Sequence, residues 1–92
     1  MNLHQHWAET ERQLRAARAE LSAVPHQEPS RGTDDRYQEY LDANELQLAL
    51  EELEGLGDQN EATPAFWDIL RTAAQRMRLR EHAVRYARRA TP

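Results

Sequence analysis

Apolar residues that recur every three or four positions constrain the fold of this chain more than any other feature of its sequence. Leu46, Ala49, Leu50, Leu53 and Leu56 show this spacing most clearly, and an α-helix places residues so spaced on one face. No stretch carries the signals of a β-strand. The sequence therefore predicts an all-α fold, a small three- or four-helix antiparallel bundle that forms one helical domain over residues 1–92.

The first predicted element is a long helix over residues 2–24, which Pro25 cannot continue. Its apolar residues form a narrow stripe along one face, which suits packing against a partner helix in this chain or in a second copy. A homodimer through residues 2–24 is therefore one interpretation. Residues 25–33 contain two Pro and one Gly without periodicity, which predicts a linker. The stripe of the long helix consists of Leu3, Trp7, Leu14, Ala17, Leu21 and Val24.

A helical body is predicted to follow over residues 34–90. Its first helix covers residues 35–41, with Thr33 or Asp34 available as the N-cap. Its clearest helix covers residues 44–57. Further along, Thr63 followed by Pro64 predicts another helix start, because threonine caps well and proline suits the first helical position.

The helix predicted over residues 44–57 carries a local signal at each end. Asn44 and Gln47 have the spacing of a capping box, in which two side chains satisfy the free backbone N–H groups of the first turn. Gly55 and Gly57 stand where the C-terminus of a helix commonly uses glycine. These signals predict that the helix begins at Asn44 and ends at the glycines.

The last third of the chain is Arg-rich, and its pattern is weaker. The helix that starts at Pro64 can continue through residues 79–89 or break near Arg78, because few apolar residues lie in that stretch. The predicted core draws on every helix and consists of Trp7, Leu14, Leu21, Leu41, Leu46, Leu50, Leu53, Phe66, Leu70 and Met77.

Composition limits the classes of protein to which the chain can belong. It has 92 residues, of which 39% are hydrophobic and 30% charged, with a mean hydropathy of −0.97. A chain of this size buries roughly 60–65% of its extended surface on folding, which allows only a thin core. The absence of cysteine excludes disulfides and thiol chemistry. No apolar run has the length of a membrane span, and residues 1–7 lack the regions of a signal peptide, so we expect a soluble cytoplasmic protein without membrane contact.

The motifs of catalysis and metal binding are missing from the sequence. Its three glycines do not form a phosphate-binding loop, and its two serines do not stand in a nucleophile elbow. His4 and His6 are two positions apart, so a helix directs them to different sides. Carboxylates three or four positions apart indicate a solvated helix face unless they are buried in a cleft. We therefore expect no enzyme activity, no cofactor and no metal ion.

Charge is unevenly distributed along the chain. The formal net charge is −4, but residues 34–61 hold ten acidic residues against one Arg, and residues 62–92 hold seven Arg against two acidic residues. Opposite charges can pair within the fold, or one of the two fields can face a partner. The net acidity and the lack of a DNA-reading element argue against nucleic acid as that partner. Pairing with the acidic helix, or exposure to solvent, is the preferred interpretation of the Arg-rich segment.

The acidic stretch also contains aromatic residues that favour protein binding. Tyrosine is enriched at the energetic centres of interfaces, and carboxylates can occupy positions where the cationic groove of a nuclease expects phosphates. We expect Tyr37 to be exposed, whereas Tyr40 can equally pack on the core. The predicted partner-binding residues are Asp34, Asp35, Tyr37, Glu39, Asp42, Glu51, Glu54 and Asp58.

Part of the chain resembles a known family. The segment EYLDANELQLALEEL at residues 39–53, PAFW at 64–67 and AAQRM at 73–77 are similar to small all-helical bacterial immunity proteins of polymorphic toxin systems, the MafI-like type. The resemblance covers roughly residues 37–79 and leaves residues 1–33 and the Arg-rich tail outside. It implies an inhibitor that binds a cognate toxin domain in the cytoplasm of the producing cell.

The residues leave other functions open beside neutralisation of a toxin domain such as a nuclease. One alternative is a phage-encoded acidic inhibitor of a nucleic-acid-binding complex, because the same carboxylates would serve as a decoy for phosphates. Another is a self-associating helical structural or adaptor protein that uses the long helix over residues 2–24. All of these are binding proteins, and they differ in the partner that they recognise.

Overall fold

The computed structural model describes residues 3–91, with side chains described from residue 6 onward. Over this range the chain forms five α-helices and no β-strand, which confirms the all-α prediction but shows that a count of three or four helices was wrong. None of the described helices is both long and apolar enough to cross a membrane. The helices are α1 (Leu3–Ala19), α2 (Asp34–Asp42), α3 (Leu46–Gln59), α4 (Pro64–Arg76) and α5 (Arg80–Ala90).

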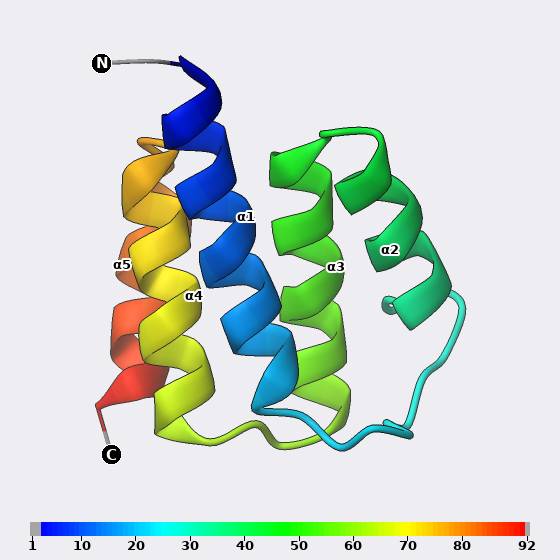
Figure 1. Ribbon diagram of the computed structural model, residues 1–92. Helices are drawn as coiled ribbons and strands as arrows, with labels where there is room; N and C mark the ends of the chain where they lie inside the picture. Colours follow the sequence, from blue (N-terminus) through cyan, green and yellow to red (C-terminus); the bar gives the residue numbers. More distant parts are fainter. Residues whose placement is uncertain (1–2, 92) are drawn as a thin grey trace.

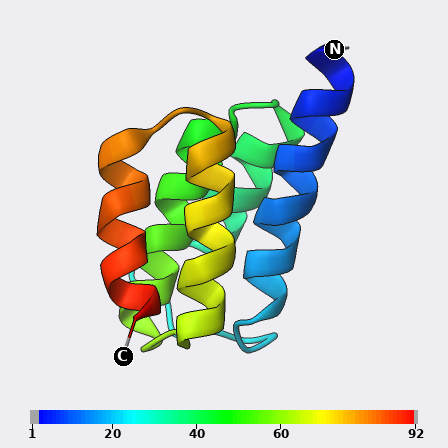
Figure 2. The same ribbon diagram turned by 90° about the vertical axis from the view of Figure 1, so that its left-hand side faces the viewer.

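Successive helices alternate in direction and lie side by side (Figure 1). Helix α3 lies in the middle of the molecule and packs against α1, α2 and α4, while α1 also packs against α4. Helix α5 packs mainly on α4, beside which it lies in Figure 2, and α2 packs mainly on α3. These two helices lie on opposite sides of the molecule in Figure 1. The α2 side belongs to the acidic part of the sequence and the α5 side to the Arg-rich part.

The core is built from side chains of all five helices. Seven of the ten predicted core residues are buried, namely Leu14, Leu41, Leu46, Leu50, Leu53, Phe66 and Leu70. Leu21 and Met77 are only partly buried, and Trp7 keeps 37% of its surface exposed. Two of the largest buried side chains, Trp67 and Tyr86, were absent from the prediction. Their ring centroids lie 5.7 Å apart, so each ring covers part of the other where α4 meets α5.

Three of the helices end at a residue with positive φ that is not glycine. These residues are Asn44 (φ 59°), Glu61 (φ 48°) and Arg78 (φ 59°). The N–H group of the residue that follows each one reaches the carbonyl oxygen five positions back, at 2.8, 3.0 and 2.9 Å respectively. This is the hydrogen bond that closes a Schellman-type helix end. The break at Arg78 answers the question that the sequence left open, and α5 is a separate helix.

The predicted capping box at Asn44 and Gln47 is wrong. Asn44 instead has positive φ, and α3 begins at Leu46 with Glu45 as an N-cap that makes no side-chain hydrogen bond. The two threonine caps are observed: Thr33 Oγ1 accepts from the N–H of the third residue of α2 at 3.2 Å, and Thr63 Oγ1 does the same for α4 at 3.3 Å.

The two glycines of α3 lie inside the helix and do not end it. A Cβ atom at Gly55 would stand 1.7 Å from the carbonyl oxygen of Arg31, and one at Gly57 would stand 2.5 Å from the ring of Phe66. Distances this short leave no room for a side chain. The glycines therefore allow two close approaches, one of residues 31–32 and one of α4, and the prediction that they terminate the helix is wrong.

The predicted linker is bound to the C-terminal end of α3. Helix α1 ends at Ala19, five residues before the expected boundary. The side chain of Asn60 exchanges two hydrogen bonds of 2.8 Å with the backbone of His26. Gln59 donates to the carbonyl of Gly32 at 3.0 Å, and Pro25 is buried. These contacts hold the connection in place and fix where α2 lies beside α3.

Candidate interaction surface

Three acidic residues on α3 each meet a basic residue on α5. The pairs are Glu51 with His82, Glu54 with Arg85 and Asp58 with Arg89. The two members of each pair are 31 positions apart in the chain. A constant difference is what two parallel helices of the same period produce, and α3 and α5 run in the same direction (Figure 1). The preferred interpretation of the Arg-rich segment, pairing with the acidic helix, is confirmed for Arg85 and Arg89.

Glu54 is the centre of this contact. Arg85 binds its carboxylate through two hydrogen bonds of 2.7 and 2.8 Å, and the hydroxyl of Tyr86 donates a third at 2.7 Å. Burial alone would raise the pKa of Glu54, but the hydrogen bonds from Arg85 and Tyr86 outweigh it and lower that pKa. Burial, with the nearby carboxylate, raises the pKa of Tyr86. Glu54 is therefore engaged within the chain as an ionised acceptor.

Arg89 connects α5 to two other helices. Its guanidinium pairs with Asp58 of α3 and lies 4.0 Å from the ring centroid of Trp67 of α4. A cation over an indole face is a favourable contact. Together with the Glu54 cluster, this contact fixes the C-terminal helix on the body of the protein.

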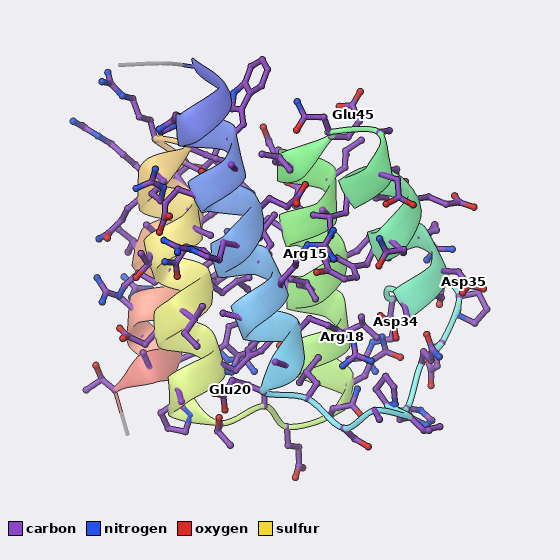
Figure 3. All side chains as sticks on the ribbon, viewed as in Figure 1. Arg15, Arg18, Glu20, Asp34, Asp35 and Glu45 are labelled. Carbon is purple, nitrogen blue, oxygen red and sulfur yellow. The ribbon has the colours of Figure 1, made fainter. Side chains whose placement is uncertain are left out.

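A second set of ion pairs fixes α2 to its neighbours. Arg18 of α1 binds both carboxylate oxygens of Asp34, at 2.8 and 2.7 Å, and these hydrogen bonds lower the pKa of Asp34. Arg36 pairs with Glu52 of α3 at 3.1 Å. Figure 3 shows Asp34 beside Arg18, on the side of α2 that faces the bundle, and Asp35 on the outer side.

Tyr37 lies in the core and not on the surface. Only 3% of its surface is exposed, and burial raises its pKa to about 12. The expectation that Tyr37 is exposed was therefore wrong. Tyr40 is partly buried against the core. Because Asp34 and Tyr37 are three positions apart, they share the face of α2 that is turned toward the bundle.

The remaining predicted contact residues share the opposite face of α2. Asp35, Glu39 and Asp42 are all exposed, and their spacing of four and three positions places them in one row. Among the described residues no Arg or His forms an ion pair with any of the three, and Asp42 accepts one hydrogen bond, from Gln38 at 2.9 Å. We call this row the α2 acidic face.

Glu45 extends the α2 acidic face at the turn between α2 and α3 (Figure 3). It is exposed and forms no ion pair with a described residue. Residue-based reasoning left it out of the contact surface, although its place three residues after Asp42 in the acidic segment was a usable signal. The predicted surface is thus divided by the structure. Its α3 acids face α5, its α2 acids at 35, 39 and 42 face solvent, and Asp34 and Tyr37 face the bundle.

Neither a metal centre nor a relative gives this surface a known chemistry. In the part of the chain that the structure describes, no group of three or more His, Asp or Glu side chains is placed to hold a metal ion. Comparison with protein-family models, with curated proteins and with solved structures finds no match. No matched protein therefore assigns a partner or a reaction to the α2 acidic face.

Proposed function

We propose that this chain is an immunity protein that binds and neutralises a cognate bacterial toxin domain, a nuclease, through the α2 acidic face. The observation that carries the proposal is the contrast among its carboxylates. Those on α3 that face α5 have basic partners within the chain. Asp35, Glu39 and Asp42 are exposed together, and no described Arg or His forms an ion pair with them. The resemblance of residues 37–79 to MafI-like immunity proteins supports the same function, exercised in the cytoplasm of the producing cell.

The spacing of the α2 acidic face suits a cationic groove. Asp35 and Asp42 are seven residues apart, which is about 10 Å along a helix and about the axial rise of three nucleotides of B-form DNA. Three carboxylates spread over this length can stand where a nuclease binds phosphates of its substrate. Complementary charge of this kind accelerates association and selects the partner. Neutralisation would then follow from occlusion of the substrate-binding groove.

The other interpretations draw less support from the packing. Leu14 and Ala17 of α1 are fully buried in the core of their own chain, so the stripe of α1 is used within the molecule and gives no argument for a homodimer. A phage-encoded inhibitor of a nucleic-acid-binding complex would use the same α2 acidic face. The identity of the captured partner distinguishes that function from immunity.

Affinity capture from the source cells, with three baits, tests the proposal. The first bait is the unchanged chain, and the second carries Asp35→Arg, Glu39→Arg and Asp42→Arg. The third carries Glu20→Arg, Glu61→Arg and Glu81→Arg, which change the net charge equally at exposed positions away from α2. We expect the first and third baits to recover a basic protein in stoichiometric amount, and the second to lose it.

The captured protein must also behave as a toxin. We expect its expression in bacteria to stop growth, and growth to be restored by co-expression of the unchanged chain or the third variant but not of the second. Equal rescue by the second variant would remove the α2 acidic face from the mechanism. Recovery of a nucleic-acid-processing complex would contradict immunity and favour the decoy, and recovery of the bait alone would contradict both.

A further inference from the structure

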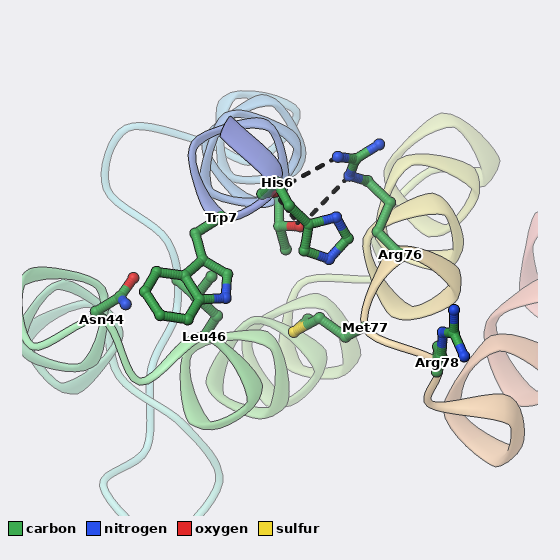
Figure 4. A pocket seen from close by; sticks show the side chains of 8 residues that line it. His6, Trp7, Asn44, Leu46, Arg76, Met77 and Arg78 are labelled. Carbon is green, nitrogen blue, oxygen red and sulfur yellow. Dashed lines mark hydrogen bonds between the residues drawn. The ribbon is translucent and has the colours of Figure 1, made fainter. Parts of the chain in front are cut away.

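An open pocket of about 610 Å³ lies at the end of the molecule where three segments meet (Figure 4). Helix α1 contributes His6 and Trp7, and the α2–α3 turn contributes Asn44. The end of α4 contributes Arg76 and Arg78. Its volume is within the range of small-molecule sites. The pocket is not lined by Asp35, Glu39 or Asp42, although Asn44 and Leu46, which flank Glu45, belong to its lining. The inference drawn from it does not rest on the proposed immunity function.

One side of the pocket is apolar. The indole of Trp7 stands between Asn44 and His6 (Figure 4) and is 37% exposed. Leu46 and the thioether of Met77 complete this side. An exposed indole beside aliphatic and sulfur groups offers a surface on which an apolar or aromatic ligand group can lie.

The other side of the pocket is cationic. Nε of Arg76 lies 3.4 Å from Thr10 Oγ1 and its Nη2 lies 3.5 Å from the carbonyl oxygen of His6, so both contacts are at the long limit of a hydrogen bond. Neither Arg76 nor Arg78 forms an ion pair with a described residue, and none of the described residues that line the pocket is acidic. A guanidinium has five N–H donors, so Arg76 keeps donors for a ligand.

One carboxylate of α1 whose charge interacts with that of Arg76 is already engaged. Glu9, which stands between Trp7 and Thr10 in the sequence of α1, is bound by Arg12. This hydrogen bond lowers the pKa of Glu9, with a smaller contribution from the charge of Arg76. Gln13 donates a further hydrogen bond to Glu9 at 3.4 Å. Glu9 forms hydrogen bonds with Arg12 and Gln13 and no ion pair with Arg76, so the N–H donors of Arg76 are not taken up by Glu9.

We propose that this pocket binds a carboxylate that is joined to an apolar group, with the carboxylate on Arg76 and the apolar group on Trp7. Planar guanidinium groups match carboxylates in geometry, and such charge-assisted hydrogen bonds are stronger than neutral ones. Two kinds of ligand have this chemistry, namely the C-terminal residue of a peptide and a free aromatic acid. Both place an anionic group within a few bonds of an apolar one.

Nitrogen-15 NMR spectroscopy of the full chain provides the test, because its two tryptophans report separately. Trp7 lines the pocket, whereas Trp67 is buried in the core and serves as an internal control. The probes are phenylacetate and acetyl-glycyl-phenylalanine, each compared with its neutral amide. We expect both acids to shift the Trp7 indole signal saturably, the amides to bind at least tenfold more weakly, and the Trp67 signal to stay unchanged.

Variants assign the contacts. Arg76→Gln should weaken acid binding at least tenfold, whereas Arg88→Gln, which removes the same charge from the exposed side of α5, should leave it unchanged. Trp7→Ala should weaken binding of both acids and is assayed through the backbone signals of Met77 and Arg78. Circular dichroism checks that each variant is folded.

The acid that binds more tightly identifies the source of the ligand, a peptide end or a free acid. The proposal is overturned if neither acid shifts the Trp7 signal, if the amides bind as well as the acids, or if Arg76→Gln and Arg88→Gln have equal effects. These outcomes are independent of the capture experiment. Failure of the immunity function would leave the pocket intact, and failure here would leave that function untouched.

Discussion

Helix α3 and helix α2 each carry a row of acidic residues, and the two rows have opposite surroundings. On α3, Glu51, Glu54 and Asp58 each face a basic side chain of α5. On α2, the row from Asp35 to Asp42 faces outward, with no described Arg or His paired to it. The comparison teaches that a carboxylate's surroundings depend on what the fold places opposite it. The acidic residues of one segment therefore divide between those that join two helices and those that face solvent, and we propose that the latter bind the partner.

The two rows also differ in energetic consequence. Exposed ion pairs contribute little individually, because water and salt screen them. The α3–α5 contact is stronger at Glu54, since a buried tyrosine hydroxyl depends on its carboxylate. The α2 acidic face keeps its charges in water at small cost. Substitutions should therefore reduce stability at the α3–α5 contact and change it only slightly on the α2 acidic face.

The largest effect is expected from removing the aromatic ring that joins α5 to the body. Tyr86→Ala should lower the free energy of unfolding by about 3–5 kcal/mol, as truncation of a buried aromatic residue does, because Tyr86 is fully buried against Trp67. Urea unfolding followed by circular dichroism measures it. Tyr40→Ala, at a partly buried position on α2, is the matched control and should cost less. An equal loss in both variants would contradict the expected difference between α5 and α2 in their contribution to stability.

A smaller loss is expected at the carboxylate of the α3–α5 contact. Glu54→Ala should lower the free energy of unfolding by about 1–3 kcal/mol, because it leaves the buried Tyr86 hydroxyl without its acceptor and Arg85 without its partner. Glu39→Ala on the α2 acidic face should change it by less than about 0.5 kcal/mol. The same urea titration compares them, and a larger loss at Glu39 would contradict our assignment of the two rows.

Acidification should weaken the paired carboxylates. The pKa values of Glu54 and Asp34 are lowered in the folded protein, so the stability that they contribute is present above their unfolded pKa values and is lost as the pH falls through the folded ones. We expect the free energy of unfolding to decrease as the pH falls below 4.5, the ordinary pKa of a glutamate. Glu54→Gln should make this decrease shallower. A decrease as steep as that of the unchanged chain would show that Glu54 is not its source.

The smallest effect is expected at the end of α2. Asp42 is the last residue of that helix, where a negative charge opposes the helix dipole and lies near Glu39 and Glu45. Asp42→Arg should therefore raise the free energy of unfolding by about 0.3–1 kcal/mol, while weakening capture of the partner. Asp42→Asn separates loss of repulsion from gain of a favourable charge and should give part of the increase. A stability loss above about 0.5 kcal/mol would contradict the interpretation of the α2 acidic face as uninvolved in folding.

The sequence predicted a helix end correctly where the interaction that forms it involves only neighbouring residues. Thr33 and Thr63 cap the helices that they were expected to cap, because a cap involves only the next three residues. The glycines of α3 misled the prediction, since Gly55 and Gly57 are required by residues distant in the chain. Asn44 and Arg78 end their helices with positive φ. Neither residue type indicates this conformation as strongly as glycine does.

The amino-acid sequence by itself determined the all-α class, the central residues of each helix and the separation of negative from positive charge along the chain. These properties follow from helical periodicity, which relates residues three or four positions apart, and from the composition of each segment. Only the tertiary structure decided that Tyr37 is buried, that Arg76 and Trp7 share a pocket, and which carboxylates stay exposed. Periodicity fixes which residues share a helix face, but the helix that packs against that face is set by contacts between residues as far apart as the 31 positions that separate Glu54 from Arg85.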